Sequence, residues 1–189
     1  MSLQINDSVF EAFPELESER LLFRDFQARD AEDLFFLKTD DQVMAHMDSK
    51  KHQSLEDTLE LIRNNQTSFV EQTGLNWAII DKAANRFIGY FGYWRLDKAN
   101  CRGEIGYSLH PDYWGHGYMK ETFSTLIPFG FKTLHLHSIE ANINPNNANS
   151  ERLLVSFGFQ KEAYFRENYL YNGVYLDSII YCLLEEDIK

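Results

Sequence analysis

The feature that most constrains the fold is a strand followed by a glycine-containing turn, a helix and a second strand. Residues 104–110 (EIGYSLH) and 138–144 (SIEANIN) alternate side chains with the period of a strand, whereas apolar side chains in residues 119–127 recur at helical spacing. Gly115 and Gly117 lie in the turn between the first strand and the helix. A crossover of this kind is right-handed and places its two strands parallel in one sheet. A ligand of such a sheet binds beyond the carboxyl ends of the strands, where the glycines lie.

Strands and two helices are predicted before this unit. Apolar runs bounded by turn residues indicate strands at residues 20–26, 75–81, 87–96 and 103–110. Asp30 is predicted to cap a helix over residues 31–38. Ser54 and Asp57 have the spacing of a capping box at the start of the next helix. That helix has a predicted buried stripe of Leu59, Ile62, Phe69 and Val70.

A helix and a hairpin are predicted after the crossover. Pro128 is expected to kink the end of the crossover helix. Asn147 or Asn149 caps a second helix, which Gly158 ends. Asn172-Gly173 lies between two aromatic runs, a strong signal for a β-hairpin turn.

Length and composition indicate one globular domain over residues 1–189. The chain is 44% hydrophobic and 15% aromatic, and it has neither an internal repeat nor a Pro/Gly/Ser linker. Without a leader or an apolar run long enough to span a membrane, we expect a cytoplasmic protein. Cys101 and Cys182 lie far apart, so neither a zinc site nor a disulfide framework is expected. The net charge of −11 argues against binding to nucleic acid.

The two glycines have two interpretations. The N-terminus of a helix presents unpaired N–H groups and partial positive charge, so Gly115 and Gly117 could bring backbone close to phosphate oxygens. Alternatively, they only supply the positive φ angles of a tight turn. The turn is neither a P-loop, since GK[ST] is missing, nor a dinucleotide GxGxxG.

Four motifs resemble the GCN5-related N-acetyltransferase (GNAT) superfamily, and within it the branch of ribosomal-protein N-terminal acetyltransferases. In the acetyl-CoA signature, Trp114 stands in the first position, Gly117 in the fixed position and Met119 in the last, a "YWGxGYM" variant of this branch. The motifs occur in the family's order, over about residues 16–184: LESERLLFRDFQARDAEDL, EIGYSLHPDYWGHGY, NPNNANSERLLVSFGF and FRENYLYNGVYLDSIIY. The resemblance implies an α/β (α+β) GNAT fold, in which helices flank a mixed central sheet with splayed parallel central strands.

By the same resemblance, acetyl-CoA is the cosubstrate and lies between the splayed strands. Its pantetheine arm is expected along Leu109, with its amides near Asn142 and Asn147. Both asparagines have the alternative of simple turn residues. The pyrophosphate is expected on the turn, whose cofactor-binding residues are Trp114, Gly115, His116, Gly117, Tyr118 and Met119. No metal is expected, because His135 and His137 share one face of a possible strand without a third ligand nearby.

Two residues are candidates for the proton transfers. Glu104 is the candidate general base, directly or through water, with a structural carboxylate as the alternative. Ser150 is the hydroxyl that would protonate the CoA sulfur, with helix capping as the alternative. Many family members carry a tyrosine acid four residues later, where this chain has Leu154.

The acceptor is expected to be a primary amine. An α-amine has a pKa about 2.5 units below that of lysine, so about 3.4 kcal/mol less is needed to make it neutral, which favours a protein N-terminus. Polyamine or antibiotic acceptors and a non-catalytic CoA-binding sensor remain alternatives. The exposed edge of the terminal hairpin allows a monomer or a homodimer. Four residues are candidates for acceptor binding: Met47, Arg166, Tyr171 and Asp177.

Overall fold

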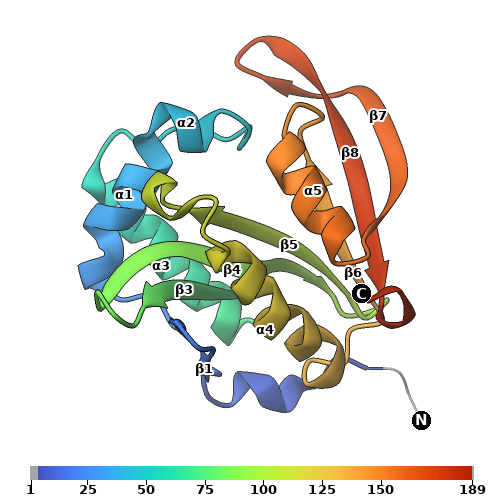
Figure 1. Cartoon of the computed structure of the whole chain (residues 1–189), viewed down its shortest axis with the longest axis horizontal. Coiled ribbons are helices and arrows are strands. Elements are labelled where there is room, and N and C mark those ends of the chain that lie inside the picture. Colours follow the sequence, from blue (N-terminus) through green and yellow to red (C-terminus); the bar gives the residue numbers. More distant parts are fainter. Residues whose placement is uncertain (1–3, 189) are drawn as a thin grey trace.

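The computed structural model describes residues 4–188, which build one eight-stranded sheet (Figure 1). In space the strands lie in the order β1-β2-β3-β4-β5-β6-β8-β7. Every neighbouring pair is antiparallel except β5 and β6, which are parallel as the crossover predicts. The strands are β1 (Leu16–Glu17), β2 (Leu21–Arg24), β3 (Leu75–Asp81), β4 (Arg86–Asp97), β5 (Arg102–Leu109), β6 (Ser138–Ile143), β7 (Gln160–Tyr171) and β8 (Val174–Leu184).

Helices cover both faces of the sheet, because successive strand residues point to opposite sides. On one face, Trp77 and Ile79 of β3 belong to the large core that also contains Phe123 of α4. On the other face, Ala78 of the same strand packs in a second core with Leu34 of α1. The helices are α1 (Ala31–Thr39), α2 (Asp41–Met44), α3 (Leu55–Val70), α4 (Tyr118–Lys132) and α5 (Ala148–Ser156), with 3-10 turns η1 (Asp7–Phe10), η2 (Ala28–Asp30), η3 (Pro111–Tyr113) and η4 (Glu185–Asp187).

The predicted hairpin turn and capping box are confirmed. Asn172 and Gly173 both have positive φ, 49° and 79°, and join β7 to β8. Ser54 accepts from the backbone N–H of Asp57, whose carboxylate accepts from that of Ser54. The hairpin projects beyond the helices, and β7 is an edge strand of the sheet (Figure 1).

Helix α4 continues through Pro128 to Lys132, and the carbonyl that the proline leaves free belongs to exposed Ser124 and can bind water. Two local predictions are wrong. Val70 is the last residue of α3 and is 78% exposed, so the buried stripe ends before it. The Asp30 side chain makes no cap bond with α1.

The charged groups of Asp30 and Arg24 instead form a buried ion pair. Two parallel hydrogen bonds of 2.7 Å join the Arg24 guanidinium to the Asp30 carboxylate, and both side chains are less than a tenth exposed. The same carboxylate accepts from the backbone N–H of Gln27. The pair therefore fixes the chain between β2 and α1.

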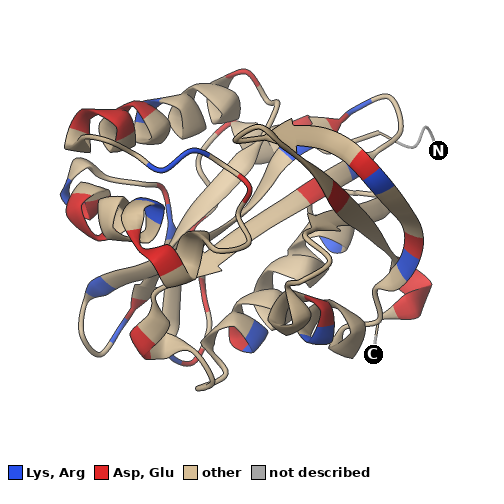
Figure 2. Ribbon diagram, turned by 90° about the horizontal axis from the view of Figure 1, so that it is seen from above, with Lys and Arg blue, Asp and Glu red and all other residues tan. Residues whose placement is uncertain are grey.

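Charge is dispersed over the rest of the surface. Acidic and basic residues are interspersed on the helices and along the outer hairpin (Figure 2). Within residues 4–188, no helix has the length and apolarity that crossing a membrane requires.

Replacing Asp30 with alanine should destabilise the fold strongly, because it leaves the Arg24 charge buried without a partner. We expect a loss of about 3 kcal/mol or more in the free energy of unfolding, measured by urea denaturation. Asp33→Ala is the matched control, since its pair with Arg86 lies partly exposed at the surface, with side chains 47% and 28% exposed, and should contribute no more than about 1 kcal/mol. Equal losses in the two variants would contradict this role for the buried pair.

Candidate active site

The site begins where β5 and β6 separate. The two strands pair only from Arg102 opposite Ser138 to Glu104 opposite Glu140. Beyond these pairs, β5 stays with β4 as far as Leu109, and β6 stays with β8. The splay predicted for the central strands is therefore present, and each strand has an inner edge on which an extended ligand could form hydrogen bonds.

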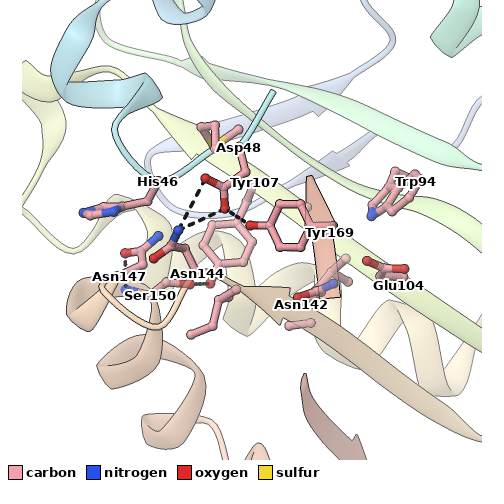
Figure 3. A pocket seen from close by; sticks show the side chains of 15 residues that line it. His46, Asp48, Trp94, Glu104, Tyr107, Asn142, Asn144, Asn147, Ser150 and Tyr169 are labelled. Carbon is pink, nitrogen blue, oxygen red and sulfur yellow. Dashed lines mark hydrogen bonds between the residues drawn. The ribbon is translucent and has the colours of Figure 1, made fainter. Parts of the chain in front are cut away.

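A cavity of about 350 Å³ fills this opening (Figure 3). Residues of β5 and β6 form its walls, and residues of the loop after α2, of α5 and of the hairpin complete it. Five residues predicted from the sequence line it together: Met47, Glu104, Asn142, Asn147 and Ser150. Its other lining residues are His46, Asp48, Trp94, Ile105, Gly106, Tyr107, Ala141, Ile143, Asn144 and Tyr169.

The glycine turn follows the carboxyl end of β5. Gly115 and Gly117 have φ angles of 76° and 81°, and Gly117 is the N-cap of α4. A Cβ atom built on Gly115 has no heavy atom within 4 Å, and one on Gly117 meets only the end of the Arg20 side chain, at 3.6 Å. The backbone here is therefore open enough for a ligand to reach the first N–H groups of α4.

Arg20 holds the turn in place through hydrogen bonds, and Glu121 in turn holds Arg20. Arg20 donates to the carbonyl of His116 at 3.0 Å and to the carboxylate of Glu121 at 2.7 Å. Its guanidinium also lies 4.0 Å from the ring centre of Tyr118. Glu121 accepts further bonds from the Ser18 hydroxyl and the Arg20 backbone. This arrangement fixes the turn without using its N–H groups.

The other predicted residues of the turn have different surroundings. The Trp114 indole N–H donates to the carbonyl of Leu109 at 2.7 Å, so this side chain braces the end of β5. The ring of His116 is exposed, whereas Met119 packs against the large core.

Glu104 lies in the cavity wall, at the last position where β5 pairs with β6. Residue Trp94 of β4 is a bulge, so that Arg95 stands opposite Glu104 and forms an ion pair with it. Burial raises the pKa of the Glu104 carboxyl, the Arg95 charge opposes that shift, and Glu140 adds to it, with a net raised value. A raised pKa brings a carboxylate closer to the range useful for a general base.

Ser150 and Asn147 lie at the start of α5. Asn147 is the N-cap, and its side chain accepts from the backbone N–H of Ser150 at 3.1 Å. Capping is thus done by Asn147, as predicted, and the Ser150 hydroxyl is left for another contact. That contact is the hydroxyl of Tyr107, at 2.5 Å.

The loop after α2 closes the cavity from above (Figure 3). Asp48 accepts from the side-chain amide of Asn144, at 3.1 Å to one oxygen, and from the hydroxyl of Tyr169. Tyr171 donates to the carbonyl of Ser49 at 2.7 Å. These bonds join Asn144, the residue after β6, and two tyrosines of β7 to a loop that follows α1 and α2.

Arg166 and Asp177 lie outside the cavity lining. Asp177 accepts from the hydroxyl of Tyr164 and from the backbone N–H of Glu167 at 2.7 Å, within the hairpin itself. His135 and His137 precede β6 and are not in a strand. Among residues 4–188, no group of three or more His, Cys, Asp or Glu is arranged to hold a metal ion.

Several residues that line the cavity were not predicted from the sequence. Asp48 and Tyr169 come from a loop and a hairpin strand whose sequences carry no pattern for this role. Tyr107 had a usable signal, because it alternates with Ile105 and Leu109 and so had to lie on one face of β5 with them.

The model of the acetyltransferase (GNAT) domain family matches residues 20–160. The chain belongs to the GNAT family. It is 32% identical over 173 residues to the uncharacterized N-acetyltransferase YoaA of Bacillus subtilis, covering 92% of this chain and 98% of YoaA. It is 35% identical over 83 residues to the [ribosomal protein uS5]-alanine N-acetyltransferase of Escherichia coli, covering 44% of this chain and 43% of that enzyme.

A solved GNAT-family acetyltransferase from Bacillus anthracis has the same architecture. Its TM-score is 0.79 at 27% identity, with 92% of this chain and 99% of the other covered. This GNAT protein is therefore an N-acetyltransferase, and the cavity between β5 and β6 is the place to locate its chemistry.

Replacing Tyr169 with phenylalanine should loosen the loop over the cavity, because it removes one of the donors to Asp48. We expect faster hydrogen exchange in residues 45–53 with little change in the thermal midpoint. Tyr175→Phe is the control, since this hairpin residue is 61% exposed and does not line the cavity. Unchanged exchange in the Tyr169 variant would show that the hydroxyl does not hold the loop.

Proposed function

We propose that this GNAT enzyme uses acetyl-CoA to acetylate the N-terminal α-amine of a protein, with a ribosomal protein as the first substrate to test. The observation that carries the proposal is the single cavity lined by Glu104 from β5 and Ser150 from α5. One wall supplies a carboxylate to accept a proton, and the other supplies a hydroxyl to donate one.

The geometry suits a long cosubstrate that enters from the glycine turn. From Glu104 to Leu109, β5 spans roughly 17 Å at about 3.4 Å per residue. The pyrophosphate would bind the backbone of Gly115 to Met119, and the pantetheine arm would follow the inner edge of β5 toward the cavity. Asn142 and Asn147, which also line the cavity, would bond its amides from the opposite wall.

The acceptor would reach the cavity beneath the loop that carries Met47. The described residues that line the cavity include the carboxylates of Glu104 and Asp48 but no lysine or arginine, which suits a basic amine. Arg166, Tyr171 and Asp177 lie further out on the hairpin, where the rest of a polypeptide acceptor would pass. The similarity to the uS5-alanine enzyme supports a protein substrate, and with it a cytoplasmic location.

Transfer follows from these positions. Glu104, directly or through water, takes a proton from the attacking amine, and backbone N–H groups on β5 stabilise the oxyanion. The carbon–sulfur bond breaks, and Ser150 gives a proton to the departing sulfur. When bound, acetyl-CoA supplies the activated acetyl group.

The test is acetyl transfer followed by mass spectrometry with three acceptors in one reaction: peptides that begin with Ala or Ser, an α-blocked peptide that contains Lys, and spermidine. We expect label on the free α-amine alone. Label only on spermidine would replace the proposal with small-molecule acetylation. Acetyl-CoA binding without any transfer would replace it with a sensor.

The acidic limb of the pH–rate profile should report Glu104 once each rate is divided by the fraction of acceptor amine that is uncharged. Because a base must be deprotonated, the rate should fall as the pH drops through its raised pKa. Arg95 lowers that pKa, so Arg95→Met should move the limb to higher pH, whereas Arg86→Met, which breaks an ion pair outside the cavity, should not. An unmoved limb in the Arg95 variant would remove Glu104 as the titrating group.

A further inference from the structure

Tyr107 lies half-buried in the cavity wall, and its hydroxyl has no role in the proposed proton transfers. Its ring is fixed by aromatic neighbours, parallel to Phe91 at 6.4 Å between ring centres and edge-on to Phe123 at 4.9 Å. The hydroxyl lies 2.5 Å from Oγ of Ser150, and both residues line the cavity. Because the ring is held so firmly, the position of this hydroxyl is set by the core of the protein.

The geometry allows either hydroxyl to donate, and their chemistry favours one of them. A phenol, with an ordinary pKa near 10, is a much stronger acid than an aliphatic alcohol, which favours the Tyr107 O–H as the donor and Ser150 Oγ as the acceptor. A serine near the start of a helix otherwise tends to turn its hydroxyl toward nearby backbone. In the part of the chain that the structure describes, Tyr107 is the only partner found for Ser150 Oγ.

A serine hydroxyl that accepts one hydrogen bond still has its own proton to give. With Tyr107 donating, the Ser150 proton is not used in the bond between the two hydroxyls, and the cavity that Ser150 lines is open to it. The Asn147 side chain accepts from the backbone N–H of Ser150, which fixes the backbone from which the hydroxyl projects.

We propose that Tyr107 is a positioning residue that orients the Ser150 hydroxyl so that its proton points at the thioester sulfur. The inference rests on the proposed function, because it needs Ser150 to act on acetyl-CoA. Tyr107 of β5 would then assist the release of the CoA thiol by acting through Ser150.

A bond forms between the amine nitrogen and the carbonyl carbon, and the carbon–sulfur bond breaks with its electron pair going to sulfur. The Ser150 proton passes to that sulfur to give free CoA, and Ser150 regains a proton from water when the products leave. The proton released by the amine goes to Glu104 or water. Tyr107 keeps its own proton throughout, consistent with a phenol pKa that burial raises.

The test is a double-mutant cycle on the full chain, with Tyr107→Phe, Ser150→Ala and the double variant. Tyr107→Phe should lower kcat by about tenfold and leave the KM for acetyl-CoA within about twofold, because one hydrogen bond near the reacting atoms is lost and the ring is kept. In the double variant, kcat should fall no further than in Ser150→Ala alone. Tyr175→Phe, a change outside the cavity, should keep the wild-type kcat, and thermal midpoints should confirm that all variants fold.

Two results would overturn the inference while leaving the proposed function intact. One is a wild-type kcat in Tyr107→Phe, and the other is a double variant whose loss is the product of the single losses, since the residues would then act independently. A wild-type enzyme that transfers acetyl to no amine would instead overturn the proposed function, and this inference with it.

Discussion

Strands β5 and β6 can stop pairing inside a sheet only because each has a second partner. Backbone groups in the interior must find hydrogen bonds, and a parallel pair that opens after three residue pairs leaves one edge of each strand without them. β4 secures the outer edge of β5 as far as Leu109, and β8 secures that of β6 to Ile143. The inner edges are then available to a ligand, and the cavity that Glu104 and Ser150 line follows from this separation.

The glycine turn depends on the same arrangement. It starts where β5 ends, so that α4 begins beside the opening. Arg20 binds the turn through the carbonyl of His116 and is itself held by the Glu121 carboxylate, so neither contact uses the N–H groups of Gly115 to Met119. In the proposed site, neutral backbone groups would let a chain with a net charge of −11 receive a phosphate-bearing cosubstrate.

Much of the scaffold could be predicted because it depends on local patterns. Alternating side chains predicted the strands of the crossover, apolar residues at helical spacing predicted its helix, and Asn172-Gly173 predicted the hairpin turn. The exposure of Ser124, whose carbonyl Pro128 leaves free, depends on tertiary packing and could not be predicted locally. The prediction for Asp30 was wrong because its carboxylate pairs with Arg24 at the end of β2 instead of capping α1.

The cavity was predictable only in part, for the same physical reason. Glu104 lies within β5 and Ser150 lies in the first turn of α5, the helix that follows β6, so the parallel pairing of β5 and β6 brings them near one another. Asp48, Asn144 and Tyr169 come together from three distant segments, and no local periodicity encodes their meeting. Arg166 and Asp177 lie on the hairpin that was predicted, but the cavity does not include them.

The most direct test of the account is the affinity for acetyl-CoA, measured by calorimetry, of Gly115→Ala compared with Gly173→Ala. Both glycines have a left-handed φ near 78° and open space around them, so the two substitutions impose similar backbone strain. If the turn before α4 receives the pyrophosphate, Gly115→Ala should weaken binding by at least about tenfold, or about 1.4 kcal/mol, and Gly173→Ala should leave it unchanged. Equal affinities in the two variants would contradict a cosubstrate site between β5 and β6 that is entered from the glycine turn.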